Sequence, residues 1–197
     1  MPIQYCGSKV LNTKRTTLRP FTTKDCESMF AYCSDPETTQ FMRFSTHKSR
    51  EETMSVLTSW EKEYEMGKFL NWAIVCHECG ELIGSIGLAA IDEFHCLGEC
   101  GYILRKDHWG KGLATECLAC IIDFCFRIGF HRIECVHSVE NPASGRVMQK
   151  VGMIKEGIKR SYYPTDHGYV DCVLYSILPS DCLHQVEQNI ARTDINE

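Results

Sequence analysis

A glycine-containing turn at residues 108–116 is the part of the sequence whose residue types point most directly to chemistry. A strand-like segment ends there and a helical pattern begins, so the first N–H groups of the helix have no acceptor within the helix. Gly110 and Gly112 let an anion approach the backbone, the helix dipole favours negative charge, and Lys111 adds a cation. The spacing matches neither the nucleoside-triphosphate loop nor the dinucleotide fingerprint. By itself the turn is thus only weak evidence for a phosphate site, and an ordinary tight turn is the default interpretation.

Cysteine chemistry is the second possibility that the sequence raises. Cys76 and Cys79 form a C-x-x-C pair, but a structural zinc needs a second pair, and Cys96 with Cys100 has the wrong spacing. The simpler interpretation is a hairpin turn in which Gly80 supplies the unusual backbone angle. The cysteine count of thirteen is odd, and the chain is long enough for a hydrophobic core. We therefore expect free thiols and no metal.

Composition excludes several classes of function. The chain has 197 residues, and 21 Lys and Arg against 26 Asp and Glu give a net charge of −5, which disfavours a nucleic-acid partner. Asp123 interrupts the best apolar run, which is far shorter than the roughly 20 residues of a membrane span. Residues 1–11 lack the pattern of a secretion signal. The sequence thus predicts one cytoplasmic domain, with a core at about 14–179 and peripheral segments at 1–12 and 180–197.

The elements that must position the turn come from hydrophobic periodicity and capping signals. In the first third of the chain, Asp35 before Pro36 opens a short helix, and Ser49 with Glu52 forms a capping box for a longer helix that ends at Gly67. The expected strands are 16–21, 69–76, 81–91, 96–105, 131–139, 153–163 and 169–178. The other expected helices are 23–33, 112–128 and one opened by Asn141 and Pro142. Residues 179–197 are polar and expected to be partly disordered. This order predicts a mixed α/β sheet.

Several motifs in this order resemble the GNAT superfamily of acyl-CoA N-acyltransferases. The motifs are Gly101-Tyr102, residues 109–116, residues 131–134, residues 140–144 and Lys150-Val151-Gly152. The match is nearest to the branch with the bacterial ribosomal-protein N-terminal acetyltransferases, and it spans about residues 16–178. The resemblance implies a single GNAT-type domain. Its twisted sheet is mixed and mostly antiparallel, splays centrally between the fourth and fifth strands, and has helices on both faces.

The resemblance also implies acetyl-CoA as the co-substrate. Its pyrophosphate would lie on the turn at 109–115, and its pantetheine arm between strands 100–105 and 131–139, bonded like an added strand. Asn141 is expected to bond this arm, although it has a sufficient role as a helix cap. The implied cofactor-binding residues are Tyr102, Ile103, Leu104, Trp109, Gly110, Lys111, Gly112, Leu113, Ala114, Thr115, Asn141 and Ser144.

Catalysis needs an uncharged amine, a donor to the oxyanion and a group that protonates the leaving thiolate. By the resemblance, Ser144 is the acid, although it could be a solvated helix serine. Glu99 and Glu156 are the candidate bases, acting through water, with Glu156 narrowly preferred. A backbone N–H near 102–104 is the expected oxyanion donor. Further candidates with structural alternatives are Glu134, Asp171, Tyr102, Tyr162 and Tyr163.

The expected reaction is transfer of the acetyl group to a primary amine, most readily the N-terminal α-amine of a protein such as a ribosomal protein. An α-amine, with a pKa of about 7.7 to 8.0, needs less help from a base than lysine does. The alternatives are a small-molecule amine, such as a polyamine or an antibiotic, and a non-catalytic acyl-CoA-binding module. The acceptor is expected between residues 23–40 and the hairpin 162–170, where Asp35, Glu37, Asp166 and Asp171 could attract a cation. A homodimer is compatible with the sequence.

Overall fold

The computed structural model describes residues 2–165 and 168–182. Its sheet has eight strands in the order β1-β2-β3-β4-β5-β6-β8-β7. The strands are β1 (Leu11–Asn12), β2 (Thr16–Arg19), β3 (Asn71–Cys76), β4 (Leu82–Asp92), β5 (Leu97–Leu104), β6 (Arg132–Ser138), β7 (Ile154–Thr165) and β8 (Gly168–Ile177). The helices are α1 (Cys26–Cys33), α2 (Pro36–Thr39), α3 (Arg50–Glu65), α4 (Leu113–Arg127) and α5 (Pro142–Lys150), with short 3-10 turns η1 (Thr23–Asp25) and η2 (Lys106–His108).

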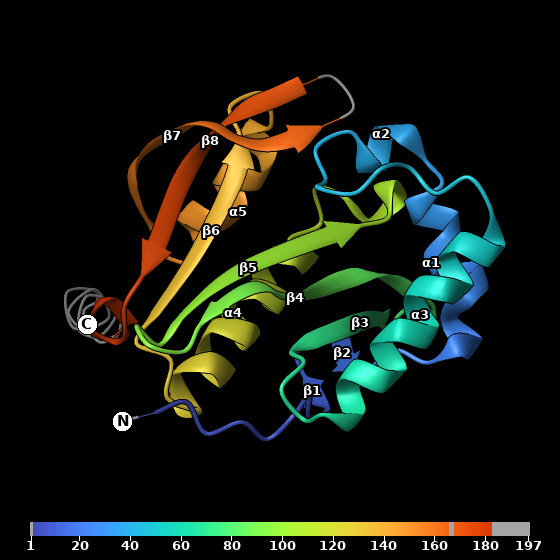
Figure 1. Cartoon of the computed structure of the whole chain (residues 1–197), viewed down its shortest axis with the longest axis horizontal. Coiled ribbons are helices and arrows are strands. Elements are labelled where there is room, and N and C mark those ends of the chain that lie inside the picture. Colours follow the sequence, from blue (N-terminus) through green and yellow to red (C-terminus); the bar gives the residue numbers. More distant parts are fainter. Residues whose placement is uncertain (1, 166–167, 183–197) are drawn as a thin grey trace, which may run out of the picture.

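The sheet splays in its middle, between β5 and β6. These strands run parallel and pair over three residues only, the last pair being Glu99 with Glu134. Beyond that point they diverge (Figure 1). The register of β4 against β5 shifts between Leu88 and Ala90, opposite the place where the pairing ends. Because a β-bulge bends its strand, this irregularity gives a physical reason for β5 to turn away from β6.

Helices cover both faces of the sheet (Figure 1). One hydrophobic cluster joins α4 and α5 to the sheet, and the Trp72 ring packs against the edge of Phe124 within it. A second cluster joins α1 and α3 to the other face, around Phe21, Tyr32 and Leu57. The α4 sequence is apolar around most of its circumference, which is why this helix lies buried along the splay.

The expected order of elements and the central splay are confirmed. The splay lies between the fourth and fifth expected strands, which are β5 and β6 because β1 precedes them in the chain. The strand expected at 16–21 ends at Arg19, before Pro20, which cannot donate to a ladder. The capping box is modified: Ser49 accepts from the Glu52 N–H, but Glu52 accepts from the Lys48 N–H instead of that of Ser49.

The N-terminal segment is bonded to the rest of the molecule. The Gln4 N–H donates to the Ile128 carbonyl at 2.7 Å, and the Trp72 indole donates to the Lys9 carbonyl at 2.7 Å. β1 then pairs with β2 at the edge of the sheet. At the other end, most of the segment expected to be disordered (residues 183–197) lies outside the described residues.

The cysteine pair lies in a hairpin turn. Cys76 ends β3, Gly80 has a φ of +72°, and the Gly80 N–H bonds the Cys76 carbonyl at 2.9 Å, which confirms the turn. All thirteen cysteines are free thiols. Within the described residues, no group of three or more His, Cys, Asp or Glu side chains could hold a metal ion. In the same part of the chain, no helix is long and apolar enough to cross a membrane.

Candidate active site

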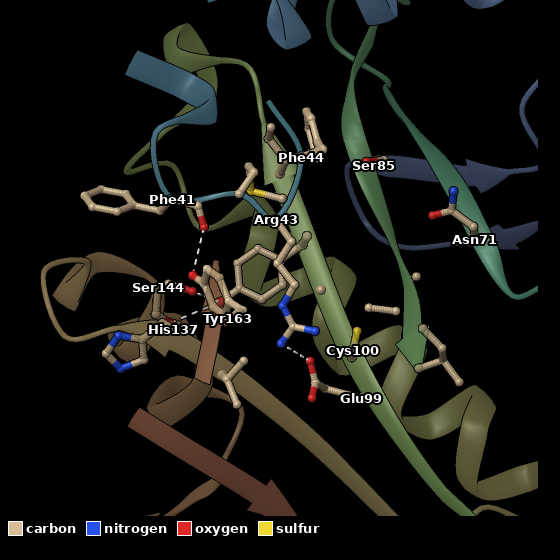
Figure 2. A pocket seen from close by; sticks show the side chains of 18 of the residues that line it. Phe41, Arg43, Phe44, Asn71, Ser85, Glu99, Cys100, His137, Ser144 and Tyr163 are labelled. Atoms are coloured by element: carbon tan, nitrogen blue, oxygen red, sulfur yellow. Dashed lines mark hydrogen bonds and ion pairs between the residues drawn. The ribbon is translucent and has the colours of Figure 1, made fainter. Parts of the chain in front are cut away.

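A cavity of about 370 Å³ opens where β5 leaves β6 (Figure 2). We call it the splay cavity. Its floor is β5 and β4, one side is β6 with the start of α5, and the other side is the segment between α2 and α3. The lining side chains that carry chemistry are Arg43, Glu99, Tyr102, His137, Asn141, Ser144 and Tyr163. Most of the remaining lining is apolar or aromatic.

The glycine turn continues from β5 through η2 into α4. Gly110 and Gly112 have φ values of +73° and +79°, a conformation that other residues rarely adopt. This geometry starts α4 at Leu113 and leaves the N–H groups of Leu113, Ala114 and Thr115 without acceptors in the helix. The Trp109 indole bonds the Leu104 carbonyl at 2.7 Å and ties the turn to the end of β5. The turn can therefore bind an anion such as a pyrophosphate.

Arg15 holds this turn in place through contacts with Lys111 and Glu116, a role that sequence reasoning missed. Its guanidinium donates to the Lys111 carbonyl at 2.9 Å and pairs with Glu116 at 2.8 Å. Burial disfavours the Glu116 carboxylate, but bonds from Thr13 and Arg15 outweigh burial and lower its pKa. The carboxylate therefore stays charged and holds the turn. No motif marks Arg15, since it lies 96 residues before Lys111.

Two hydroxyl groups meet across the cavity. The Tyr102 hydroxyl lies 2.8 Å from the Ser144 hydroxyl and 3.0 Å from the Ser144 carbonyl oxygen. Ser144 is held at the first turn of α5, where its N–H donates to the Asn141 side chain at 3.3 Å. Burial raises the pKa of Tyr102 well above its ordinary value. The phenol therefore stays protonated and can donate.

Glu99 is the buried carboxylate of the cavity. It is 5% exposed, accepts from the Tyr162 hydroxyl at 2.7 Å, and forms an ion pair with Arg43. Figure 2 shows the Arg43 guanidinium pointing at this carboxylate. A buried carboxylate requires such partners, because its charge is otherwise poorly solvated. The structure therefore brings Glu99 together with Tyr102 and Ser144 in one cavity.

The structure does not bring Glu156 into the cavity. Glu156 lies on β7, where Arg132 holds it in a bidentate pair and the Ser176 hydroxyl donates to it at 2.6 Å. These bonds lower its pKa. Because Glu156 is not among the lining residues of the cavity, it is poorly placed to accept a proton in a reaction at Ser144. The preference for Glu156 over Glu99 as the base therefore finds no support in this geometry.

The remaining candidate residues form two groups: those that can offer only backbone groups to a ligand, and acids that are held by other residues of the protein. Ile103, Leu104 and Leu113 have buried side chains and can offer only backbone groups to a ligand. Glu134 pairs with Arg132 and Lys159, and Asp171 accepts from the Ser161 N–H, whose residue has a φ of +47°. These two acids have evident structural roles.

Residues 41–44 and Trp60 of α3 line the splay cavity. Residues 23–40, which were expected beside the acceptor, are not among the lining residues. The Tyr163 hydroxyl donates to the Phe41 carbonyl at 3.1 Å, which joins the β7–β8 hairpin to this wall. Glu37 pairs with Lys106, Asp35 caps α2, and Asp166 lies outside the described residues. The wall is aromatic because Phe41, Phe44 and Trp60 contribute to it.

A splayed sheet beside an anion-binding helix terminus is the architecture of an acyl-CoA-dependent N-acyltransferase. The chain belongs to the GNAT acetyltransferase family, since residues 15–154 match the Acetyltransferase (GNAT) domain. It is 32% identical over 170 residues to the uncharacterized N-acetyltransferase YoaA of Bacillus subtilis (strain 168), covering 86% of this chain and 96% of YoaA. A GNAT-family acetyltransferase structure from Bacillus anthracis is 25% identical with a TM-score of 0.76, covering 86% and 98%. The chain is therefore an enzyme with acetyl-CoA as its co-substrate.

Other relatives differ in the acceptor that their names give. One is YdaF, a putative ribosomal N-acetyltransferase of B. subtilis (strain 168). It is 26% identical over a match that covers 63% of this chain and 67% of YdaF. The spermidine N(1)-acetyltransferase of Vibrio cholerae serotype O1 (strain ATCC 39315 / El Tor Inaba N16961) is 30% identical and covers 54% and 62%.

Proposed function

We propose that this enzyme acetylates the N-terminal α-amine of a protein, such as a ribosomal protein. The observation that carries the proposal is the acceptor side of the splay cavity, where Glu99 is the one acidic residue among the described lining residues and the rest of the wall is largely apolar or aromatic. A protein N-terminus brings one cationic group followed by a chain, which suits a single carboxylate between aromatic walls. A polyamine brings several ammonium groups and would need several acids.

The donor half of the proposal uses the glycine turn and the splayed strands. The N–H groups at the start of α4, with Lys111, would hold the pyrophosphate of acetyl-CoA. The facing edges of β5 and β6 would bond its pantetheine arm, from Tyr102 to Leu104 on one side and near Asn141 on the other. The fit rests on glycines with positive φ at the turn and on strand edges that have no partner in the splay.

The catalytic part of the proposal places a proton acceptor on one side of the cavity and a proton donor on the other. Glu99 accepts a proton from the incoming ammonium, directly or through water, and leaves an uncharged amine. The amine nitrogen then bonds the acetyl carbon, and the carbon–sulfur bond breaks. The leaving thiolate takes a proton from the Tyr102–Ser144 hydroxyl pair, which is refilled from solvent or from the amine's second N–H proton. The buried, neutral Tyr102 phenol supports this role.

The small-molecule alternative keeps one specific argument in its favour. The cavity is lined by Trp60, Phe69 and Tyr163 and is small for a folded partner. A flexible N-terminus of a few residues still fits this volume, since only its first residues need to enter.

The test is mass spectrometry of a mixed acceptor panel incubated with acetyl-CoA, with free CoA quantified. The panel contains ribosomal-protein N-terminal peptides, spermidine and an aminoglycoside. Acetylation of a peptide α-amine, lost in Glu99→Gln, supports the proposal. Acetylation of spermidine or the aminoglycoside alone would replace it with the small-molecule function. A thiol dye is unsuitable, because the chain carries thirteen free cysteines.

A further inference from the structure

The guanidinium of Arg43 lies in a three-sided enclosure. Its central carbon is 5.3 Å from the centre of the Tyr162 ring and 4.9 Å from that of the Tyr163 ring, and it pairs with Glu99. We call Glu99, Tyr162 and Tyr163 the cation cage. A carboxylate beside two aromatic rings is a general recognition site for cations, including alkylammonium ions.

The residues of the cage lie on strands of the sheet, whereas Arg43 lies in a segment outside the helices and strands. Glu99 lies on β5, and both tyrosines lie on β7. Arg43 belongs to the segment between α2 and α3, and its side chain is 37% exposed while that of Glu99 is 7% exposed. The Arg43 guanidinium therefore lies nearer to solvent than the Glu99 carboxylate, and only another cation can replace it without leaving that buried charge unpaired.

The same carboxylate faces the acceptor side of the reaction. With Arg43 in place, one oxygen of Glu99 pairs with the guanidinium and the other accepts from Tyr162. The negative charge of Glu99 is then already neutralised, so a second cation gains little by approaching it. An acceptor amine arrives mostly as an ammonium ion near neutral pH. For the ammonium to bind Glu99, Arg43 must give up its position.

We propose that the cation cage is the binding site for the acceptor ammonium, and that Arg43 occupies it as an internal stand-in when no acceptor is present. The inference rests on the proposed function, because it concerns the acceptor of the same reaction. It assigns the substrate class as singly charged amines whose ammonium fits between two aromatic rings. Arg43 is then a specificity-determining residue, since an acceptor must compete with its charge.

The test uses tetramethylammonium, a cation that cannot be acetylated, so binding is measured whether or not an acceptor is known. Its affinity is measured by calorimetry in the presence of saturating CoA. Arg43→Met removes the Arg43 charge while keeping an apolar side chain against the tyrosines, and it leaves in place Lys159, whose Nζ lies 4.3 Å from the centre of the Tyr162 ring. We expect Arg43→Met to bind tetramethylammonium about five- to tenfold more tightly than the natural protein. Adding Tyr162→Leu to that variant should remove most of the gain.

Arg50→Met is the matched control. Arg50 pairs with Glu27 and lies 5.0 Å from the Phe30 ring, so it makes the same kinds of contact outside the cavity. This variant should bind the probe as the natural protein does. Arg43→Lys, which keeps the charge and is the milder change, guards against misfolding and should bind more weakly than Arg43→Met.

Two results would overturn the inference. Weaker binding in Arg43→Met would mean that Arg43 itself supports the cation site, and unchanged binding would mean that cations bind elsewhere. Both are distinct from a failure of the proposed function, which would appear as an absence of peptide acetylation with the probe still bound in the cage.

Discussion

The Tyr102 hydroxyl on β5 and the Ser144 hydroxyl on α5 lie 2.8 Å apart, across the opening where the sheet has lost its backbone pairing. The two residues are 42 positions apart in the chain, and they lie on β5 and on α5, the helix that follows β6 in the chain. The hydroxyl pair therefore forms only when both elements are correctly placed. This arrangement makes the pair a sensitive probe of the site.

Removing the Tyr102 hydroxyl should slow the chemical step. If the pair protonates the leaving thiolate, Tyr102→Phe should lower kcat by about 100-fold with little change in the KM for acetyl-CoA. Ser144→Ala should lower kcat less, and the double variant should resemble Tyr102→Phe because the two groups act as a unit. Steady-state kinetics on the acetylated acceptor checks this.

Tyr175→Phe is the control for that experiment. Tyr175 is also buried, and its hydroxyl accepts from Gln149 at 2.9 Å outside the splay cavity. Its loss should leave kcat unchanged. Equal kcat values for Tyr102→Phe and the natural enzyme would remove the hydroxyl pair from the mechanism.

The glycine turn can be tested with two glycines of the same backbone geometry. Gly110 in the turn and Gly67 after α3 both have a φ of +73°, and a Cβ atom would meet nothing within 4 Å at either position. Gly110→Ala and Gly67→Ala should therefore lose similar stability, about 1 kcal/mol from the left-handed conformation. Only Gly110→Ala should weaken CoA binding, by about tenfold, since the backbone N–H groups there face the anion. Calorimetric titration with CoA gives the CoA affinities of the two variants. Equal CoA affinities would exclude the turn as the pyrophosphate site.

Gly145 is required by the packing of a buried histidine. A Cβ atom at this position would lie 2.6 Å from Nε2 of His137, whose ring is held by a 2.7 Å bond between Nδ1 and the Ser138 carbonyl. Gly145→Ala should lower the free energy of unfolding by about 1 to 3 kcal/mol and shift the start of α5. Adding His137→Ala should restore part of the stability. Urea denaturation measures both effects, and a fully stable Gly145→Ala protein would show that the ring is free to move.

The Arg132–Glu156 pair should give a pH-dependent stability without affecting catalysis. Bonds from Arg132 and then Ser176 lower the pKa of Glu156 in the folded protein, so the unfolded chain binds its proton at higher pH. The contribution of the pair is therefore complete above the ordinary glutamate pKa of about 4.3 and is lost as the pH falls through the lowered folded value.

Glu156→Gln should accordingly lower Tm by about 1 to 4 °C at pH 7, a modest effect because the Glu156 side chain is 36% exposed. The difference from the natural protein should shrink as the pH approaches and passes below about 4. Thermal melts between pH 7 and 3.5 test this, and at pH 7 the variant should have the same kcat as the natural protein. A large loss of kcat would return Glu156 to the catalytic step.

The elements that sequence alone predicted are those whose signals are local. α4 has an apolar pattern with a glycine at each end, so both of its ends were located within one residue, and the start of α5 was located from Asn141 as cap and Pro142 as first residue. β1 has only two residues and no periodicity. β1 forms because it pairs with the edge of β2, and no local sequence pattern predicts this pairing.

The candidate site was predictable on the donor side and less so on the acceptor side. The glycine turn is continuous in the chain and carries its own geometry. The Arg43–Glu99 contact joins residues 56 positions apart, and an arginine between Met42 and Phe44 gives no sign of its partner. The same limit applies to Glu99 and Glu156, because the pairing of Glu156 with Arg132 depends on the arrangement of the whole sheet.

The three-residue seam, in which Leu97, Gly98 and Glu99 of β5 pair with β6, also sets the angle at which the two strands diverge. Both strands are fixed together at one end only, so a small change of angle at the seam becomes a larger change of width at Tyr102 and Ser144. Gly98 lies in the seam, where a Cβ atom would meet Leu88 and Phe130 at 3.0 Å. Packing around Gly98 therefore helps to set the distance between the Tyr102 and Ser144 hydroxyls, although Gly98 does not line the cavity.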